Sequence, residues 1–373
     1  MPATIPTQGP VNRAPAAQAS AGPHQHPTGR DPVVDLIRAA CLCVVVVMHT
    51  MMAGVTVEDD GLHVFKALQD QSWFVPVSWV VQVMPLFFLA GGVASVTQWQ
   101  RARSIGAKPG DYVRSRLHRL VFPALVAFLA LGAGQCAATL AGAPVETLAE
   151  VGRLMGLPLW FLGVYLGTSV LVPVMVRAHE AAPARTMLLL VSAAAAVDLV
   201  SATYQVPALG FANLAFVWLA MQQAGFWYAD GWFQSRTAAQ LRFGAAASIA
   251  ALLFVTVTGT YSADMLANLN PPNITLLLVG AAQTFLLAAA GPKLRAVSRN
   301  RYVRTAVTAI GGRAMTIYLW HIPVLVIISA LGLAAGLAWP EPHSVLWWFT
   351  RIFWIAAVAA ALLPVAGWFG RYE

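Results

Sequence analysis

Residues 30–50 of the chain read RDPVVDLIRAACLCVVVVMHT. A helix needs about 20 mostly apolar residues to cross a bilayer, so this stretch predicts a transmembrane helix near 33–54. An ionisable side chain inside such a helix costs several kcal/mol unless it is paired or faces a wet cavity. Asp35, Arg38 and His49 are therefore the first candidates for a functional site.

The spacing of these residues places them on one face of the predicted helix. Arg38 and His49 are eleven residues apart, about 1100° of rotation and within roughly 20° of three full turns. The helical rise separates them by about 16 Å, and Asp35 shares the face of Arg38. Two alternatives remain open. Arg38 also fits a topology anchor, and His49 fits a neutral side chain bonded to a backbone carbonyl.

The composition of the whole chain agrees with a membrane protein. Of 373 residues, 58% are hydrophobic and 10% are charged, whereas a soluble protein carries about 25% charged residues. This excludes a single soluble domain, a disordered chain and a nucleic-acid-binding module. The net charge of +8 is expected from basic cytoplasmic loops and needs no anionic partner.

Apolar stretches recur along the chain and predict an all-α membrane protein, a bundle of about ten transmembrane helices. Residues 1–32 are expected to form a disordered cytoplasmic tail, and residues 33–371 a transmembrane domain. With both termini cytoplasmic, all of the 23 Lys and Arg residues except Lys66, Arg153 and Arg351 fall on the cytoplasmic side, as the positive-inside rule requires. The predicted spans are 33–54, 74–97, 117–140, 157–177, 185–203, 209–228, 240–260, 273–291, 306–335 and 344–369.

The ninth predicted helix repeats the pattern of the first. Residues 310–331 read IGGRAMTIYLWHIPVLVIISAL, with Arg313 near the cytoplasmic end and His321 further in. Tyr318 lies three residues before His321 and shares its face. Two histidines inside separate helices suggest one cavity between those helices. The alternative is an aromatic cluster of Tyr318, Trp320 and His321 that anchors the helix at the membrane interface.

A basic segment precedes the third predicted helix. Residues 101–123 read RARSIGAKPGDYVRSRLHRLVFP, and Arg114, Arg116 and Arg119 stand where this helix begins. Such a cluster can grip phosphates from the cytoplasm. Orientation of the helix and binding of anionic lipids explain the same charges equally well.

Three further features of the sequence concern helix packing, an isolated acidic residue and the motifs of other enzyme classes. Pro85 and the pair Gly91–Gly92 predict a kink or a close helix contact. Asp198 suits either a proton path or, as we favour, a shallow position near the outer end of its helix. Motifs of P-loop ATPases, zincins and α/β-hydrolases are missing from the sequence, and we expect no metal site.

Together these motifs resemble the acyltransferase-3 family of integral-membrane acyltransferases, from Arg30 onward. The resemblance implies that residues 33–371 form a transmembrane acyltransferase domain. The chain departs from the common family pattern at Ala90, where many members have Ser, and at Leu159, where many have His. The five elements that carry the resemblance are Arg38 with His49, Phe87–Phe88 with Gly91, Arg116 with Arg119, the LWFL stretch 159–162, and Tyr318 with His321 and Pro323.

The resemblance implies transfer of an acyl group, expected to be acetyl, from cytoplasmic acyl-CoA to a hydroxyl of a carbohydrate, glycosylated or lipid acceptor. It implies a multi-pass protein of the bacterial cytoplasmic membrane with no tightly bound cofactor. A proton-coupled exporter of an anion or polysaccharide is the alternative to an enzyme.

Each candidate residue then has an expected role. His49 would act as general base or transient acyl carrier, with Tyr318 and His321 lining the acceptor side or polarising the thioester. Arg38, held by Asp35, would bind or orient the donor. Arg114, Arg116 and Arg119 would receive the CoA phosphates.

Overall fold

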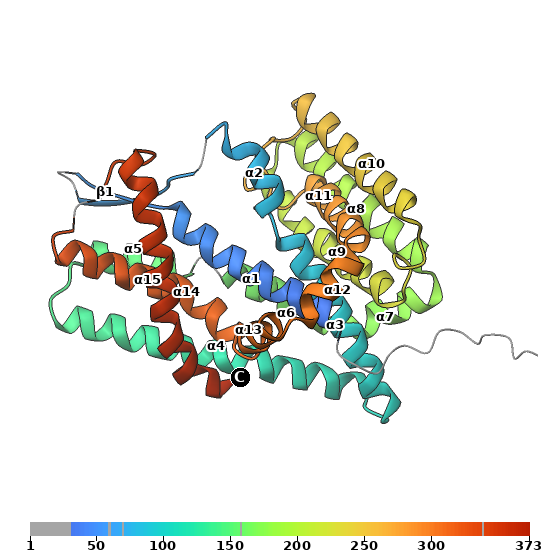
Figure 1. Cartoon of the computed structure of the whole chain (residues 1–373), viewed down its shortest axis with the longest axis horizontal. Coiled ribbons are helices and arrows are strands. Elements are labelled where there is room, and N and C mark those ends of the chain that lie inside the picture. The colour runs from blue at the N-terminus through green and yellow to red at the C-terminus, as the bar shows by residue number, and fades with distance from the viewer. Residues whose placement is uncertain (1–30, 59–60, 69–70, 157–158, 338) are drawn as a thin grey trace, which may run out of the picture. The chain divides into compact units, whose positions relative to one another are not determined.

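The computed structural model describes residues 31–58, 61–68, 71–156, 159–337 and 339–373. Apart from two short strands, the regular elements of this part are helices (Figure 1). Residues 1–30 of the predicted tail lie outside it. In chain order the elements are α1 Pro32–Met52, β1 Ala53–Glu58, β2 Gly61–Lys66, α2 Phe74–Val81, α3 Met84–Ser104, α4 Pro109–Leu140, α5 Val145–Gly156, α6 Leu159–Val170, α7 Val172–Ala181, α8 Pro183–Tyr204, η1 Pro207–Ala212, α9 Asn213–Ala229, α10 Ala238–Val257, α11 Ile274–Ala289, α12 Gly291–Arg299, α13 Arg301–Gly311, α14 Ala314–Ala334, α15 Val345–Phe369 and η2 Gly370–Tyr372.

The helices have the lengths and apolar character that a multi-pass membrane protein requires. Within the described residues, seven spans are long and apolar enough to cross a membrane, or nine if each of two bent helix pairs is one span. A helix stands at each of the ten predicted places, but α9, in the place of predicted span 209–228, has only 17 residues. The all-α membrane class is therefore confirmed, while the count of ten and the orientation of the termini stay predictions.

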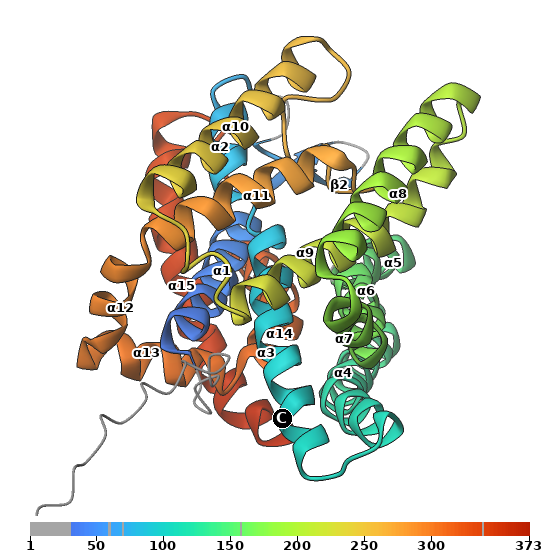
Figure 2. The same ribbon diagram turned by 90° about the vertical axis from the view of Figure 1, so that its right-hand side faces the viewer.

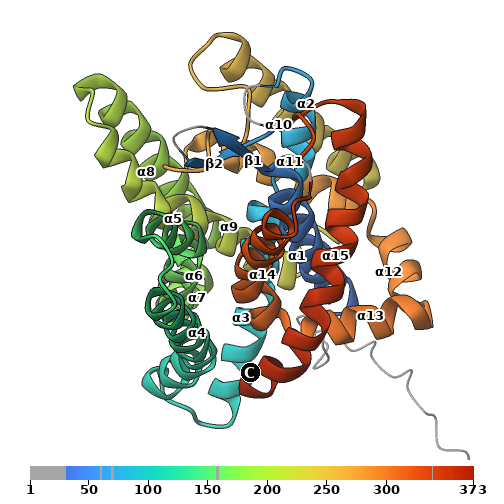
Figure 3. The ribbon, with the colours of Figure 1, turned by 90° about the vertical axis from the view of Figure 1, so that its left-hand side faces the viewer.

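The first helix passes through the middle of the bundle. Asp31 caps it by accepting a hydrogen bond of 2.8 Å from the backbone N–H of Val33, and Pro32 fits its first turn because that position needs no N–H donor. Helix α1 contacts α3 and α13 and lies beside α14 and α15 (Figure 3). Its far end leads directly into the hairpin of β1 and β2, which the sequence did not predict.

Glycines allow α3 and α9 to pack backbone against backbone. A Cβ atom added at Gly92 would lie 2.4 Å from the carbonyl oxygen of Gln222, and one at Gly225 would lie 2.2 Å from that of Leu89. Small residues permit this close approach between membrane helices. Next to the contact, Phe88 of α3 stacks on Trp218 of α9 with ring centroids 4.5 Å apart. The predicted role of Gly92 in a close helix contact agrees with this packing.

The second predicted span is broken near the residue that suggested a kink. Helix α2 ends at Val81 and α3 begins at Met84, with Pro85 in its first turn (Figure 2). Backbone groups freed inside a membrane must find partners in the protein. The side chain of Gln283 from α11 supplies one by donating to the carbonyls of Trp79 and Gln82 at 3.2 and 3.0 Å.

The segment between α10 and α11, residues 258–273, lies against this break, and we call it the cover loop. The indole N–H of Trp79 donates to the carbonyl of Ala263 at 2.8 Å. The backbone of Met265 is held at both ends, because its N–H donates to Ser78 Oγ at 3.0 Å and its carbonyl accepts from Gln82 Nε2 at 3.1 Å. The cover loop is therefore fixed to the broken span by hydrogen bonds.

Two predicted boundaries differ from the structure. The helix predicted at 117–140 begins at Pro109, so the basic cluster lies on its first turns. The span predicted at 306–335 is two helices, because α13 ends at Gly311 and α14 starts at Ala314. Two adjacent glycines separate them, and glycine disfavours a continuous helix because its backbone loses most entropy there.

Replacement of Gly92 by alanine tests the contact between α3 and α9. The added methyl group would overlap the Gln222 carbonyl, so we expect Gly92→Ala to lower stability by roughly 1–3 kcal/mol, measured by thermal unfolding in detergent. Gly132→Ala is the matched control, because nothing lies within 4 Å of its added Cβ. Equal melting temperatures for the two variants would contradict the close packing.

Candidate functional site

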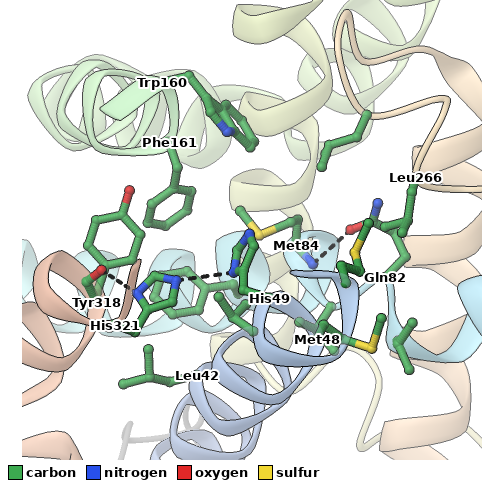
Figure 4. Close-up of a pocket in the computed structure, with 16 residues that line it drawn as sticks. Leu42, Met48, His49, Gln82, Met84, Trp160, Phe161, Leu266, Tyr318 and His321 are labelled. Carbon is green, nitrogen blue, oxygen red and sulfur yellow. Dashed lines mark hydrogen bonds between the residues drawn. The ribbon is translucent and has the colours of Figure 1, made fainter. Parts of the chain in front are cut away.

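A cavity of about 130 Å³ lies where α1, α14, α6, the broken span and the cover loop meet (Figure 4). The sequence predicted a cavity between the first and ninth spans, and the structure contains one. It is lined by Leu42, Val45, Met48, His49 and Met52 from α1, Val81, Gln82, Val83, Met84 and Phe87 around the break, Trp160 and Phe161 from α6, Leu266 and Leu269 from the cover loop, and Tyr318 and His321 from α14.

The two predicted histidines contact each other at this cavity. His49 Nδ1 and His321 Nε2 are 3.1 Å apart, and the ring centroids are 5.0 Å apart. His49 lies in the last turn of α1 and is half-buried. His321 is only 2% exposed, and its Nδ1 lies 2.6 Å from the carbonyl oxygen of Tyr318 (Figure 4).

These partners assign the proton positions when both rings are neutral. A carbonyl oxygen can only accept, so His321 Nδ1 must carry the hydrogen that bonds to Tyr318. His321 Nε2 then has a lone pair and accepts from His49 Nδ1–H. The remaining nitrogen of His49, Nε2, is left with its own lone pair. An imidazole whose one nitrogen has a free lone pair, while a hydrogen bond from its other nitrogen orients the ring, can act as a general base.

Tyr318 and two residues of the LWFL stretch form the wall beside the histidines. Phe161 and Tyr318 make an edge-to-face contact with centroids 5.1 Å apart. Trp160 lines the same cavity. Phe87 of the second-span motif also lines this cavity, and its ring centroid lies 5.1 Å from that of Phe161. The structure thus brings together four of the five sequence elements around one space.

Arg38 lies along α1 from this cavity, about 16 Å from His49 by the helical rise. It is half-buried and does not line the cavity. The predicted support of Arg38 by Asp35, three residues before it on the same helix, stays a prediction.

The structure separates the three arginines of the basic cluster. Arg116 is 8% exposed and donates from Nη2 to Ser95 Oγ at 3.1 Å, while its Nε has no partner in the described structure. Arg114 and Arg119 are exposed on the same helix. The sequence did not predict that Arg116 would be buried while the other two arginines are exposed.

Sequence reasoning missed most of the apolar wall. Met48 and Met52 are four residues apart in α1 and so share a face, a signal that was available. The contributions of Gln82 and Leu266 depend on the break in the second span and on the cover loop. No periodicity in the sequence marks either of them.

Asp198 is part of a separate polar cluster that anchors the cover loop. Its carboxylate accepts from Asn213 Nδ2 at 2.7 Å, from the Tyr261 hydroxyl at 3.0 Å and from the backbone N–H of Ile274 at 2.9 Å. Burial and the neighbouring Asp198 carboxylate raise the pKa of Tyr261, which keeps that hydroxyl a donor. The three bonds support a structural position for Asp198.

The fold and the site define a multi-pass membrane protein with a pair of histidines that line an apolar cavity. Comparison with protein families finds the acyltransferase domain over residues 31–369. The chain belongs to the acyltransferase-3 family of membrane acyltransferases, as its sequence motifs predicted. Comparisons with curated proteins and with solved structures gave no match. Among the described residues, no three His, Cys, Asp or Glu side chains are grouped so as to hold a metal ion.

Substitution of Asp198 separates its structural role from a proton path. Asp198→Ala leaves three donors without their acceptor, so we expect a loss of roughly 1–3 kcal/mol in thermal unfolding experiments. Asp198→Asn keeps one acceptor oxygen, so it should lose less stability than Asp198→Ala and should retain activity. Full stability of both variants together with complete loss of activity would instead identify a proton path.

Proposed function

We propose that this protein transfers an acyl group from cytoplasmic acyl-CoA to a hydroxyl group of a carbohydrate, glycosylated or lipid acceptor. The observation that carries the proposal is the contact of His49 Nδ1 with His321 Nε2 at 3.1 Å. It orients His49 with Nε2 available for a proton, beside a cavity of the size of a small substrate group. Membership of the acyltransferase-3 family supports the same class of reaction.

The reaction follows from the position of this lone pair. His49 Nε2 takes the proton of the acceptor hydroxyl while the hydroxyl oxygen attacks the thioester carbonyl carbon. The new carbon–oxygen bond forms, the carbon–sulfur bond breaks, and His49 returns the proton to the CoA thiolate. The lone pair of His321 Nε2 stabilises the imidazolium form of His49 in between. Transient transfer of the acyl group to His49 is a second route through the same residue.

The arginines are proposed to hold the donor on the cytoplasmic side. Helix α4 has 32 residues, about 48 Å, and therefore exceeds a hydrocarbon core of about 30 Å. In the predicted orientation its first turns, with Arg114 and Arg119, lie in water and are free to bind phosphates. Arg38 stands between this side and His49, at a separation comparable with the reach of a pantetheine arm. The roles of Arg116 and Asp35 toward the donor stay predictions.

Substitution of the histidines tests the catalytic step. We expect His49→Ala to lower the rate of acyl transfer at least about 100-fold, measured as free CoA released from acyl-CoA by purified protein. As a positioning residue, His321 should be replaced best by a side chain that still accepts a hydrogen bond. His321→Gln should therefore retain more activity than His321→Leu.

Membrane insertion and the melting temperature of each variant are the controls for folding. Normal turnover by His49→Ala would exclude His49 as base and as acyl carrier. Transport of an anion between two compartments without cleavage of the thioester would instead favour the alternative of an exporter.

Substitution of the exposed arginines tests donor binding. Each of Arg114→Gln and Arg119→Gln removes one charge-assisted hydrogen bond, so we expect the KM for acyl-CoA to rise about tenfold with little change in kcat. Arg242→Gln, an exposed arginine of α10, is the matched control. Acyl-pantetheine lacks these phosphates, so its use should be unaffected. Unchanged KM values for acyl-CoA would show that the phosphates bind elsewhere.

A further inference from the structure

The cavity beside His49 is almost entirely apolar. Its polar side chains besides the histidines and Tyr318 are the Trp160 indole and the amide of Gln82. Gln82 is already engaged, because Oε1 accepts from the backbone N–H of Met84 at 3.4 Å and Nε2 donates to Met265. A sugar ring would need several hydrogen-bond partners to leave water. The cavity therefore does not suit a carbohydrate and does suit an aliphatic group.

The size of the cavity limits that group. Its volume of about 130 Å³ is close to the roughly 150 Å³ of an engineered apolar cavity that binds benzene, a six-carbon molecule. A saturated chain of about four to six carbons would fill it, whereas an acetyl group would leave most of it empty. An unfilled apolar space beside a ligand forfeits dispersion contacts.

The walls of the cavity determine the direction in which a bound aliphatic chain extends from His49. In Figure 4, His49 stands between His321 on one side and Met48, Gln82 and Leu266 on the other. An acyl group with its carbonyl at His49 can therefore extend away from His321, past Met48. Leu266, carried by the hydrogen-bonded cover loop, lines the cavity on this side.

We propose that the cavity is the acyl-chain pocket of the donor and takes a saturated acyl group of about four to six carbons. This rests on the proposed acyltransferase function and replaces the expectation of acetyl. An apolar chain could belong to the donor or to a hydrophobic acceptor. The donor is favoured because its acyl carbon chain must adjoin the carbonyl that reacts at His49, whereas the reacting part of a carbohydrate acceptor is polar.

Binding of a series of donors tests the pocket without knowledge of the acceptor. The full chain in nanodiscs is titrated calorimetrically with CoA and with acetyl-, butyryl-, hexanoyl- and octanoyl-CoA, and empty nanodiscs correct for partition into lipid. Burial of each methylene should raise the affinity about fourfold. We expect the affinity to rise from acetyl to a maximum at butyryl or hexanoyl and to fall at octanoyl.

Variants of the closing wall should move this maximum in both directions. Leu266→Trp fills the far end and should shift the preference to acetyl, whereas Leu266→Ala should shift it toward octanoyl. Leu188→Trp on the exposed face of α8 is the matched control and should leave the profile unchanged. Met48→Trp provides the same test from α1 if a Leu266 variant fails to fold.

The outcomes separate this inference from the proposed function. Absence of binding for CoA and every acyl-CoA would overturn both. Binding of CoA with equal affinity for all chain lengths, or a maximum at acetyl in the unsubstituted protein, would overturn only the acyl-chain pocket. A flat donor profile combined with altered use of alkyl-glycoside acceptors by the Leu266 variants would assign the cavity to a hydrophobic acceptor and overturn the donor assignment.

Discussion

The site depends on one constraint, that a polar group inside a membrane must find its partners within the protein. His49 Nδ1 and His321 Nε2 meet this constraint by bonding to each other at 3.1 Å. The other ring nitrogen of His321, Nδ1, bonds to the Tyr318 carbonyl oxygen. Each of these two hydrogen bonds determines where the next proton lies. The lone pair of His49 Nε2 therefore remains free. The same interaction that makes two histidines tolerable in an apolar bundle thus leaves one of them with the free nitrogen that the proposed reaction needs.

The same constraint shapes the walls around the pair. The break between α2 and α3 frees backbone carbonyls, and Gln283 of α11 satisfies two of them. Gln82 at the break binds the backbone of the cover loop, which Asp198 and Tyr261 hold from the other side. The amide of Gln82, which lines the cavity, is already bonded at both its oxygen and its nitrogen. The cavity beside His49 therefore remains almost entirely apolar, although polar residues lie around it.

In the proposed function, this division between a polar frame and an apolar space would separate the phosphates of the donor from its reacting thioester. Walls with few hydrogen-bond partners disfavour bound water, which would protect the thioester of the proposed donor from hydrolysis. The phosphates of the proposed donor would bind at the basic ends of helices such as α4. Residues of α1 connect the two environments, since Arg38 and His49 lie on one helix about 16 Å apart.

The sequence by itself determined the membrane class, the places of the helices, the family, and the common face of Arg38 and His49, because composition and helical period are local properties. Only the tertiary structure decided that His49 meets His321, which is 272 residues away in the chain, that Arg116 is buried while Arg119 is exposed, and that Leu266 lines the cavity. These outcomes depend on how helices cross and where a span breaks, and packing between distant segments leaves no period in the sequence.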